Sequence, residues 1–544
     1  MDDLRTSGVD QHVDPDDWKE GHWSIRIGLL NIGSRLIAGY RKRPLIFAPA
    51  TILALATLYA ERDVVQPWLL AARIYAPGLV LPALMLGVLW LLFRKRSARL
   101  KTFGGAIGAG VIALVVFFGF VTHDYVSQYF RYETLKIADL NALPLTTHER
   151  VIPLNGIYTA LQQRTNETDQ PSRPDLIRDG NEYRWTSAIE PAYAWNRFFD
   201  SIHEVRSISA TETSPDYSKK ISTEVEFATG EDMLWSRDVL SCVRRSFDPL
   251  RAFSYEPGNV LYMKDDQGAW VQVVSLIRWT GFLFPWPEFG GVQVIEQGDT
   301  TIFGRLLMGC GTWIPPEDIN KYPYLRGQNL VPTQVSRSMA ASLRFQNGFW
   351  GPMPFNRAGD LRIADVETDV NPQPFTLPFT FKTWAGSQTK LYQYFALEPH
   401  DADKQGLSTS FFVPADGIGT IYRYRHFALG EQPLGPTAVG DQVRSKQKSY
   451  DWTAAMVAEV RPYIRDIADS NGLVKRRFLW MATVVTLRKN ADGTLSKDFV
   501  PGAAPEIDII DAKHGDAVWV DSYDPTKWPG QLSQTLGTIW AQNE

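Results

Sequence analysis

The sequence predicts a membrane-anchored protein, with three N-terminal transmembrane helices followed by a large α+β, β-rich, mostly antiparallel extracytoplasmic region. Three observations predict this fold class. The first 122 residues contain three long apolar runs without charge, and lysine and arginine are distributed unevenly around these runs. In the remaining residues, strand-like segments outnumber helical ones and do not alternate with them, which favours antiparallel pairing. The length of 544 residues suggests about three to four folding units.

The apolar runs cover residues 44–60, 74–93 and 102–122. Because ~20 helical residues cross the ~30 Å hydrocarbon core of a bilayer, the second and third runs are long enough and the first is at the short limit. The alternative is a buried helical hairpin in a large protein. The absence of charge inside the runs favours an anchor over a transporter acting alone. Gly104 and Gly108 allow close helix packing, either within the anchor or between copies.

The basic residues around the runs predict the orientation of the anchor. Residues 35–43 and 94–101 are rich in lysine and arginine, whereas the other two flanks contain few. We therefore expect a multi-pass protein of the plasma (inner) membrane, with a cytoplasmic N-terminus and a periplasmic or extracellular C-terminal region. The expected domains are a cytoplasmic N-terminus with an interfacial amphipathic helix (1–43), the anchor (44–122), an α+β subdomain (123–330) and a β-rich subdomain (331–544).

Hydrophobic periodicity predicts the elements of the outer region. The expected helices are 187–205, 236–246, 333–344 and 452–469. The expected strands are 221–228, 259–264, 269–278, 291–297, 361–366, 391–397, 409–413, 418–425, 480–488, 506–511 and 517–521.

The stretch WTGFLFPWPEFGG, residues 279–291, is unusually aromatic and contains two prolines. It has three interpretations: a part of the core, a binding surface for a protein or a glycan, or a contact with the outer leaflet. A similar stretch, GFWGPMP, occupies residues 348–354, and we expect the two to occupy related positions. The predicted partner-binding residues are Trp279, Phe282, Phe284, Trp286, Phe289, Phe349, Trp350 and Phe355.

Three further groups of residues are candidates for sites. Arg423, Arg425 and His426 predict a basic stripe for an acidic ligand, or else a solvated sheet face. Glu398, His400, Asp401 and Asp403 are a weak metal candidate and fit a polar surface loop as well. Cys242 and Cys310 would tend to oxidise outside the cytoplasm, closing a loop that adds ~3–4 kcal/mol, or else stay as buried thiols.

Sequence motifs of common catalytic sites are missing, and we identify no catalytic residue. The chain contains no GxxxxGK[ST], HExxH, GxSxG or GxGxxG pattern, so no cofactor is expected. A net charge of −4 disfavours nucleic acid as a partner. The expected function is non-catalytic binding or scaffolding of envelope components, with the lipid bilayer and envelope proteins as partners. The alternatives are an anchored hydrolase of envelope polymers and an accessory subunit of a transport or secretion complex. A homo-oligomer is compatible with each.

Overall fold

The computed structural model describes residues 44–93, 110, 123–149, 154–162, 165–211, 221–298, 301–352, 360–364, 373–383, 386–400, 406–426, 432–446, 450–489, 495–499, 506–520 and 524–543. The chain divides into two compact units, residues 1–62 and 63–544. In the first unit, α2 (Pro44–Ala60) is a helix with Pro49 inside it. Every other element described below belongs to the second unit, apart from the first residue of α3 (Arg62–Phe93).

The predicted three-helix transmembrane anchor is wrong. Within the described residues, no helix is both long enough and apolar enough to cross a membrane. α2 is shorter than the ~20 residues that a crossing requires. The second predicted run is the C-terminal part of α3, and two polar residues in the first turns of this helix are bonded to the rest of the chain. Asp63 forms a buried ion pair with Arg245, and Gln66 donates to the carbonyls of Ala252 and Tyr255. The third run, with Gly104 and Gly108, lies outside the described residues except for Gly110.

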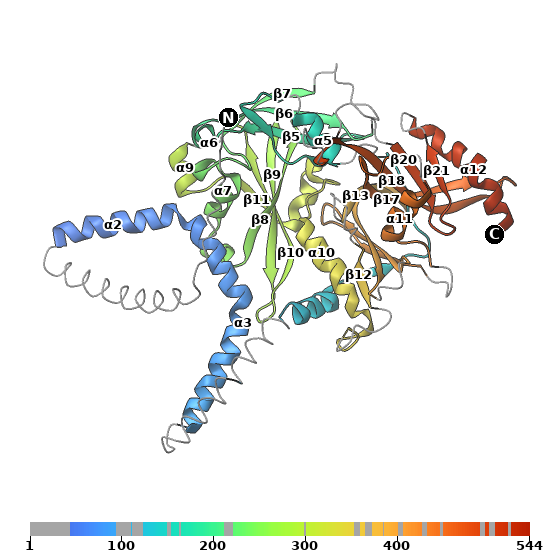
Figure 1. Ribbon diagram of the computed structural model, residues 1–544. Coiled ribbons are helices and arrows are strands. Elements are labelled where there is room, and N and C mark those ends of the chain that lie inside the picture. Colours follow the sequence, from blue (N-terminus) through green and yellow to red (C-terminus); the bar gives the residue numbers. More distant parts are fainter. Residues whose placement is uncertain are drawn as a thin grey trace, which may run out of the picture. The chain divides into compact units, whose positions relative to one another are not determined.

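The structure is β-rich and contains several antiparallel sheets (Figure 1). The first two sheets in chain order have the strand orders β3-β5-β6-β7, with β4 beside β5, and β11-β10-β9-β8. Their strands are β3 (Asp169–Pro171), β4 (Asp175–Asp179), β5 (Glu182–Pro191), β6 (Ile202–Ser209), β7 (Ser222–Phe227), β8 (Tyr255–Lys264), β9 (Trp270–Thr280), β10 (Trp286–Glu296) and β11 (Thr312–Ile314).

The other two sheets have the orders β1-β16-β15-β14-β13-β2, with β12 beside β14, and β17-β18-β20-β21, with β19 beside β18. Within the described residues, β1 with β16 is the one parallel strand pair. The strands are β1 (Ile137–Asp139), β2 (Leu145–Thr146), β12 (Leu361–Ile363), β13 (Phe375–Thr383), β14 (Gly386–Pro399), β15 (Thr409–Pro414), β16 (Ile421–Arg425), β17 (Ala455–Ala468), β18 (Val474–Lys489), β19 (Leu495–Phe499), β20 (Glu506–Asp511) and β21 (Ala517–Val520).

Short helices connect and cover these sheets. They are an α-helix at residues 123–134 and α5 (Leu154–Gln162), α6 (Ala194–Phe199), α7 (Val239–Ser246), α8 (Pro249–Ala252), α9 (Ile302–Leu307), α10 (Thr333–Ser342), α11 (Pro436–Lys446) and α12 (Trp528–Asn543). The 3-10 helices are η1 (Trp235–Arg237), η2 (Pro316–Lys321), η3 (Pro323–Leu325), η4 (Leu343–Asn347) and η5 (Pro525–Lys527).

The periodicity of α12 explains how the C-terminal helix is held. Trp528, Leu532, Leu536 and Trp540 recur every four residues and therefore share one face of the helix. All four are buried in one hydrophobic cluster with residues of β17, β18, β20 and β21. The other face of the same sheet packs against the sheet that contains β13 to β15. Both faces of this sheet are thus covered by apolar side chains.

α10 lies between two sheets and forms one wall of the cleft described below. Its buried residues Val335, Met339 and Ala340 share a cluster with Ile277 of β9 and with residues of β12, β14 and β15. Figure 1 shows the helix α10 between β10 and β12. Met339 and Ala340 follow Val335 by four and five residues and therefore share its face of the helix, whereas Gln334 and Ser338 lie outside the cluster. The sequence prediction of a helix at 333–344 is confirmed by α10 and the following η4.

A disulfide joins Cys242 of α7 to Cys310, which follows α9. The two Cα atoms are 5.5 Å apart, a separation that a disulfide normally spans. Gly309, next to Cys310, lies close to the backbone of α7: a Cβ at this position would be 2.3 Å from the backbone nitrogen of Ser246. Its φ of +77° also favours glycine. The bond therefore fixes the end of α9 against α7.

Candidate functional site

The aromatic stretch 279–291 forms the end of the β9–β10 hairpin. Trp279 and Thr280 end β9, and Trp286 begins β10 opposite Thr280. Gly281 turns the chain with a φ of +96°, a conformation that glycine adopts without strain. At the tip, the Phe282 side chain is 89% exposed and Leu283 is also exposed. The tip therefore presents apolar side chains to solvent.

The helix at 123–134 packs against this hairpin. The Ser127 hydroxyl donates to the carbonyl of Pro285, at 2.6 Å. Phe130 stacks on Phe284 and Trp286, with ring centroids 6.2 and 6.5 Å apart. Phe284, Trp286 and Phe289 are partly buried, and Phe289 packs against the cluster around α10. The predicted binding residues thus divide into an exposed tip and a half-buried base.

The second aromatic stretch contacts another face of the same helix. Phe349 packs edge-on against Tyr125 and Tyr129, and its carbonyl accepts a hydrogen bond from the Tyr125 hydroxyl. Trp350 is 69% exposed. This stretch follows the 3-10 helix η4, whereas the first stretch is a hairpin turn, so the two differ in local structure. Phe355 lies outside the described residues.

Glu288 is the polar centre of the hairpin base. Its carboxylate accepts hydrogen bonds from Arg131 at 3.0 Å, Arg278 at 3.0 Å, Thr280 at 2.8 Å and the Trp286 indole at 3.2 Å. Burial alone would raise the pKa of Glu288, but the hydrogen bonds and the Arg131 charge lower it overall. Arg131 is buried. The ionised carboxylate therefore holds the helix at 123–134 against the hairpin.

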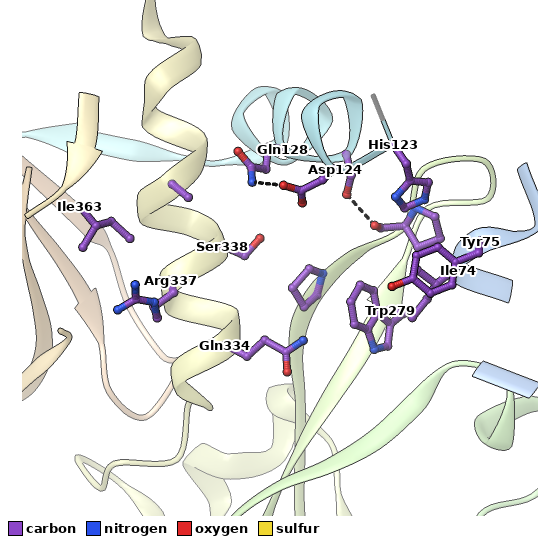
Figure 2. Close-up of a pocket in the computed structure, with 14 residues that line it drawn as sticks. Ile74, Tyr75, His123, Asp124, Gln128, Trp279, Gln334, Arg337, Ser338 and Ile363 are labelled. Carbon is purple, nitrogen blue, oxygen red and sulfur yellow. Dashed lines mark hydrogen bonds between the residues drawn. The ribbon is translucent and has the colours of Figure 1, made fainter. Parts of the chain in front are cut away.

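A cleft of about 540 Å³ lies between the helix at 123–134, α10, the middle of α3 and the hairpin (Figure 2). Figure 2 shows Trp279 and Tyr75 on one side, and Arg337, Ser338 and Gln334 along α10 on the other. The polar lining residues Asp124 and Gln128, which are hydrogen-bonded to each other at 2.8 Å, come from the helix at 123–134. An aromatic wall facing several polar side chains is typical of a site for a small polar ligand.

His123 lies at the edge of the cleft among aromatic rings. It is buried, with its ring 6.0 Å from Tyr75 and 5.9 Å from Phe284. Burial lowers the pKa of His123, although the Ile74 carbonyl and the Asp124 charge act in the opposite direction. We therefore expect the imidazole to be neutral at pH 7, so that it contributes a polar edge to the cleft without adding a charge.

The predicted basic stripe on β16 is occupied by contacts within the chain. Arg423 is buried and forms a two-pronged ion pair with Asp139, at 2.7 and 3.1 Å, and Arg425 lies 3.7 Å from the same carboxylate. His426 is buried and bonded to the Ser410 hydroxyl at 2.9 Å. Burial lowers the pKa of His426 to about 3. The arginines join β16 to β1.

The weak metal candidate is only partly described, because Asp401 and Asp403 lie outside the described residues. Glu398 is buried at the end of β14, 3.7 Å from Arg362. Burial raises its pKa to about 7, although Arg362 acts in the opposite direction. Among the described residues, no group of three His, Cys, Asp or Glu side chains is placed to hold a metal ion.

An acidic cluster at the first sheet was not singled out from the sequence. Glu190 of β5 is buried, and its carboxylate accepts hydrogen bonds from the backbone amides of Glu231 and Asp232, at 2.8 and 2.7 Å. Burial raises the pKa of Glu190 to about 7 and that of Asp175 to about 6. The sequence signal for a buried carboxylate was the single glutamate, Glu190, within the otherwise uncharged run SAIEPA. Because its oxygens are enclosed and bonded to a turn, Glu190 acts as a structural residue.

Comparisons with known proteins add no function to this geometry. The chain matches none of the known protein-family models, and a search of curated proteins finds no match. A solved structure of an uncharacterized protein from Eubacterium rectale has 11% identity and a TM-score of 0.14, covering 52% of this chain and 81% of that one. A protein of unknown function from Dyadobacter fermentans has 10% identity and a TM-score of 0.17, covering 66% and 85%. These likenesses are too low to support an argument.

Proposed function

We propose that this chain is a non-catalytic binding protein of the cell envelope, and that it holds the saccharide part of an envelope component in the cleft beside Trp279. The observation that carries the proposal is the composition of the cleft, where Trp279 and Tyr75 face Gln128, Gln334 and Ser338. Flat aromatic rings stack on the apolar faces of sugar rings, and amide and hydroxyl groups pair with sugar hydroxyls.

The envelope location rests on the disulfide between Cys242 and Cys310. Disulfides form and persist in oxidising compartments and are rare in the cytosol. The exposed tip residues Phe282 and Leu283 support the same function, because they extend the apolar surface beyond the hairpin base. Large exposed aromatic side chains commonly contribute to binding.

The hydrolase alternative has less support. It requires two carboxyl groups that reach the two sides of a scissile bond. In the acidic cluster, Glu190 is fully enclosed and bonded to backbone amides. In the cleft, Asp124 is the one carboxylate among the lining residues that the structure describes. This arrangement favours binding over cleavage.

Co-sedimentation of the purified full chain with insoluble peptidoglycan tests the proposal. We expect the wild type to pellet with the polymer and to release no soluble sugar. Ser338→Trp fills the cleft from α10 and should abolish pelleting. Thr535→Trp, on an exposed position of α12, is the matched control and should pellet like the wild type. Equal pelleting of Ser338→Trp, or release of sugar fragments by the wild type, would contradict the proposal.

A further inference from the structure

A second exposed apolar surface lies on α6, η1 and α9, apart from the cleft residues. We call it the α6–α9 patch and define it by Tyr193, Trp195, Phe199, Trp235, Phe303 and Met308. Trp195 is 72% exposed, Phe303 73% and Met308 80%. None of the six residues of α6 is buried, although three of them are aromatic. The aromatic side chains of α6 are therefore not part of the hydrophobic core.

Hydrogen bonds through η1 join the segments of the patch into one surface. The amide of Leu234, just before η1, donates to the Arg197 carbonyl at 3.1 Å. Arg237 donates to the carbonyl of Phe198 at 3.1 Å. On the other side, Arg305 of α9 donates to the Ser236 carbonyl at 3.0 Å. The disulfide then holds the end of α9 against α7. The patch is consequently preorganised in the isolated chain.

The arginine side chains of these segments point their donors inward, and the Asp200 carboxylate is the exposed charge. Residues 193–200, 235–237 and 301–308 contain three arginines and one aspartate, Asp200. Arg197 donates to the carbonyl of Pro191 at 3.1 Å, and Arg237 and Arg305 donate to the carbonyls given above. A surface that binds lipid headgroups would normally extend its basic side chains outward. A surface that faces a copy of itself must instead avoid placing like charges opposite each other.

We propose that the α6–α9 patch is the interface of a symmetric dimer of this chain. A two-fold interface is reciprocal: if residue i of the first copy contacts residue j of the second, then residue j of the first copy contacts residue i of the second. The patch supplies both parts of such a contact. Trp195, Asn196, Phe199 and Asp200 line a hollow of about 380 Å³, and Phe303 projects from α9. Phe303 of each copy fills the hollow on α6 of the other. Aromatic residues and methionine are enriched in interfaces of this kind.

Sedimentation velocity of the full chain over roughly 1–50 μM tests the proposal, because specific interfaces that bury roughly 1,200–2,000 Å² commonly have dissociation constants within or below that range. We expect the wild type to be dimeric. Phe303→Asp and Trp195→Lys should each raise the dissociation constant at least tenfold, as for a residue at the centre of an interface. The double variant should associate again, because the introduced carboxylate on α9 of one copy then faces the introduced ammonium group on α6 of the other.

Leu250→Asp is the matched control, because Leu250 is 83% exposed on α8, outside the patch. It should remain dimeric, and circular dichroism should show that every variant is folded. A monomeric wild type, an unchanged dimer in Phe303→Asp, or no recovery in the double variant would overturn the proposal. So would a monomeric wild type that floats with phosphatidylcholine–phosphatidylglycerol vesicles in a Trp195-dependent way, since the patch would then face lipid.

Discussion

At the scale of single residues, Glu288 explains how the aromatic stretch 279–291 is both exposed and ordered. It is the one charged residue of that stretch. Its carboxylate collects donors from β9, β10 and the helix at 123–134. The tip at Phe282 can therefore remain in solvent while the base of the hairpin is fixed. The geometry of the cleft depends on this same carboxylate, because Trp279 and Pro287 belong to the hairpin.

We predict that Glu288→Gln lowers the free energy of unfolding by about 2 kcal/mol, because it leaves Arg131 buried without a countercharge. Urea denaturation at pH 7 measures the change. The matched control is Glu182→Gln, which removes an exposed carboxylate that pairs with Arg184 at 3.1 Å. Exposed pairs contribute little, so the control should change stability by less than about 0.5 kcal/mol. Equal stability of the two variants would show that Glu288 does not hold the helix.

Buried carboxylates predict the pH dependence of stability. Burial raises the pKa of Glu190, Glu398 and Asp508 to about 7 in the folded chain. A raised folded-state pKa means that the folded chain binds protons more tightly than the unfolded chain. The stability from each group is therefore complete below its unfolded pKa, near 4, and is lost as the pH rises to about 7. We expect the melting temperature to fall between pH 5 and pH 8.

Asp508→Asn tests this relation at one site. Neither carboxylate oxygen of Asp508 has a hydrogen-bond partner within the described residues. At pH 8 the substitution removes a buried charge and should stabilise the fold by about 1–2 kcal/mol, an advantage that shrinks at pH 5. Glu317→Gln, at an exposed carboxylate on η2, should have no such effect. A destabilised Asp508→Asn at pH 8 would contradict this explanation.

At the scale of elements, the sequence predicted helices correctly where one face was clearly apolar, as in α10. It failed for 452–469, which is the strand β17. Most positions of β17 are buried on both faces of its sheet, so the strand lacks the alternation that would have identified it. The predicted helix 187–205 is instead the end of β5, the short helix α6 and the start of β6. Pro191 marks the end of β5 and was the available signal.

The cleft could be predicted only in part. Trp279 was identified because local composition marks the stretch around it. Tyr75, Gln128, Gln334 and Ser338 were missed, because they come from separate parts of the chain. Long-range packing of α3, the helix at 123–134, the hairpin and α10 brings them together. A single sequence contains no local pattern for such a convergence.

The disulfide gives a prediction at the same scale. It closes a loop with a sequence separation of 68 residues, which restricts the unfolded chain. The double variant Cys242→Ser, Cys310→Ser should lose about 3–4 kcal/mol of unfolding free energy. A reductant should lower the melting temperature of the wild type and leave that of the double variant unchanged. If the reductant has no effect on the wild type, the bond does not contribute to stability.

At the scale of the whole molecule, the error in the predicted anchor has a physical reason. Counting apolar residues in a window does not show where a helix begins or what its first turns contact. α3 begins at Arg62, well before the apolar run at 74–93, and its first turns pack on α7 and α8 through Asp63 and Gln66. The structure is a set of antiparallel sheets in which α10 separates two of them. The cleft opens where this helix meets the hairpin.

Calorimetric titration of the full chain with chitotetraose, a soluble tetramer of N-acetylglucosamine, tests the central claim most directly. We expect saturable binding with one site per chain, which Ser338→Trp abolishes and Thr535→Trp leaves unchanged. Gln334→Ala should weaken the affinity roughly tenfold, as expected for the loss of one or two hydrogen bonds to a sugar. Absence of saturable heat with the wild type, or equal affinity of the wild type and Ser338→Trp, would contradict the assignment of the cleft as a saccharide site.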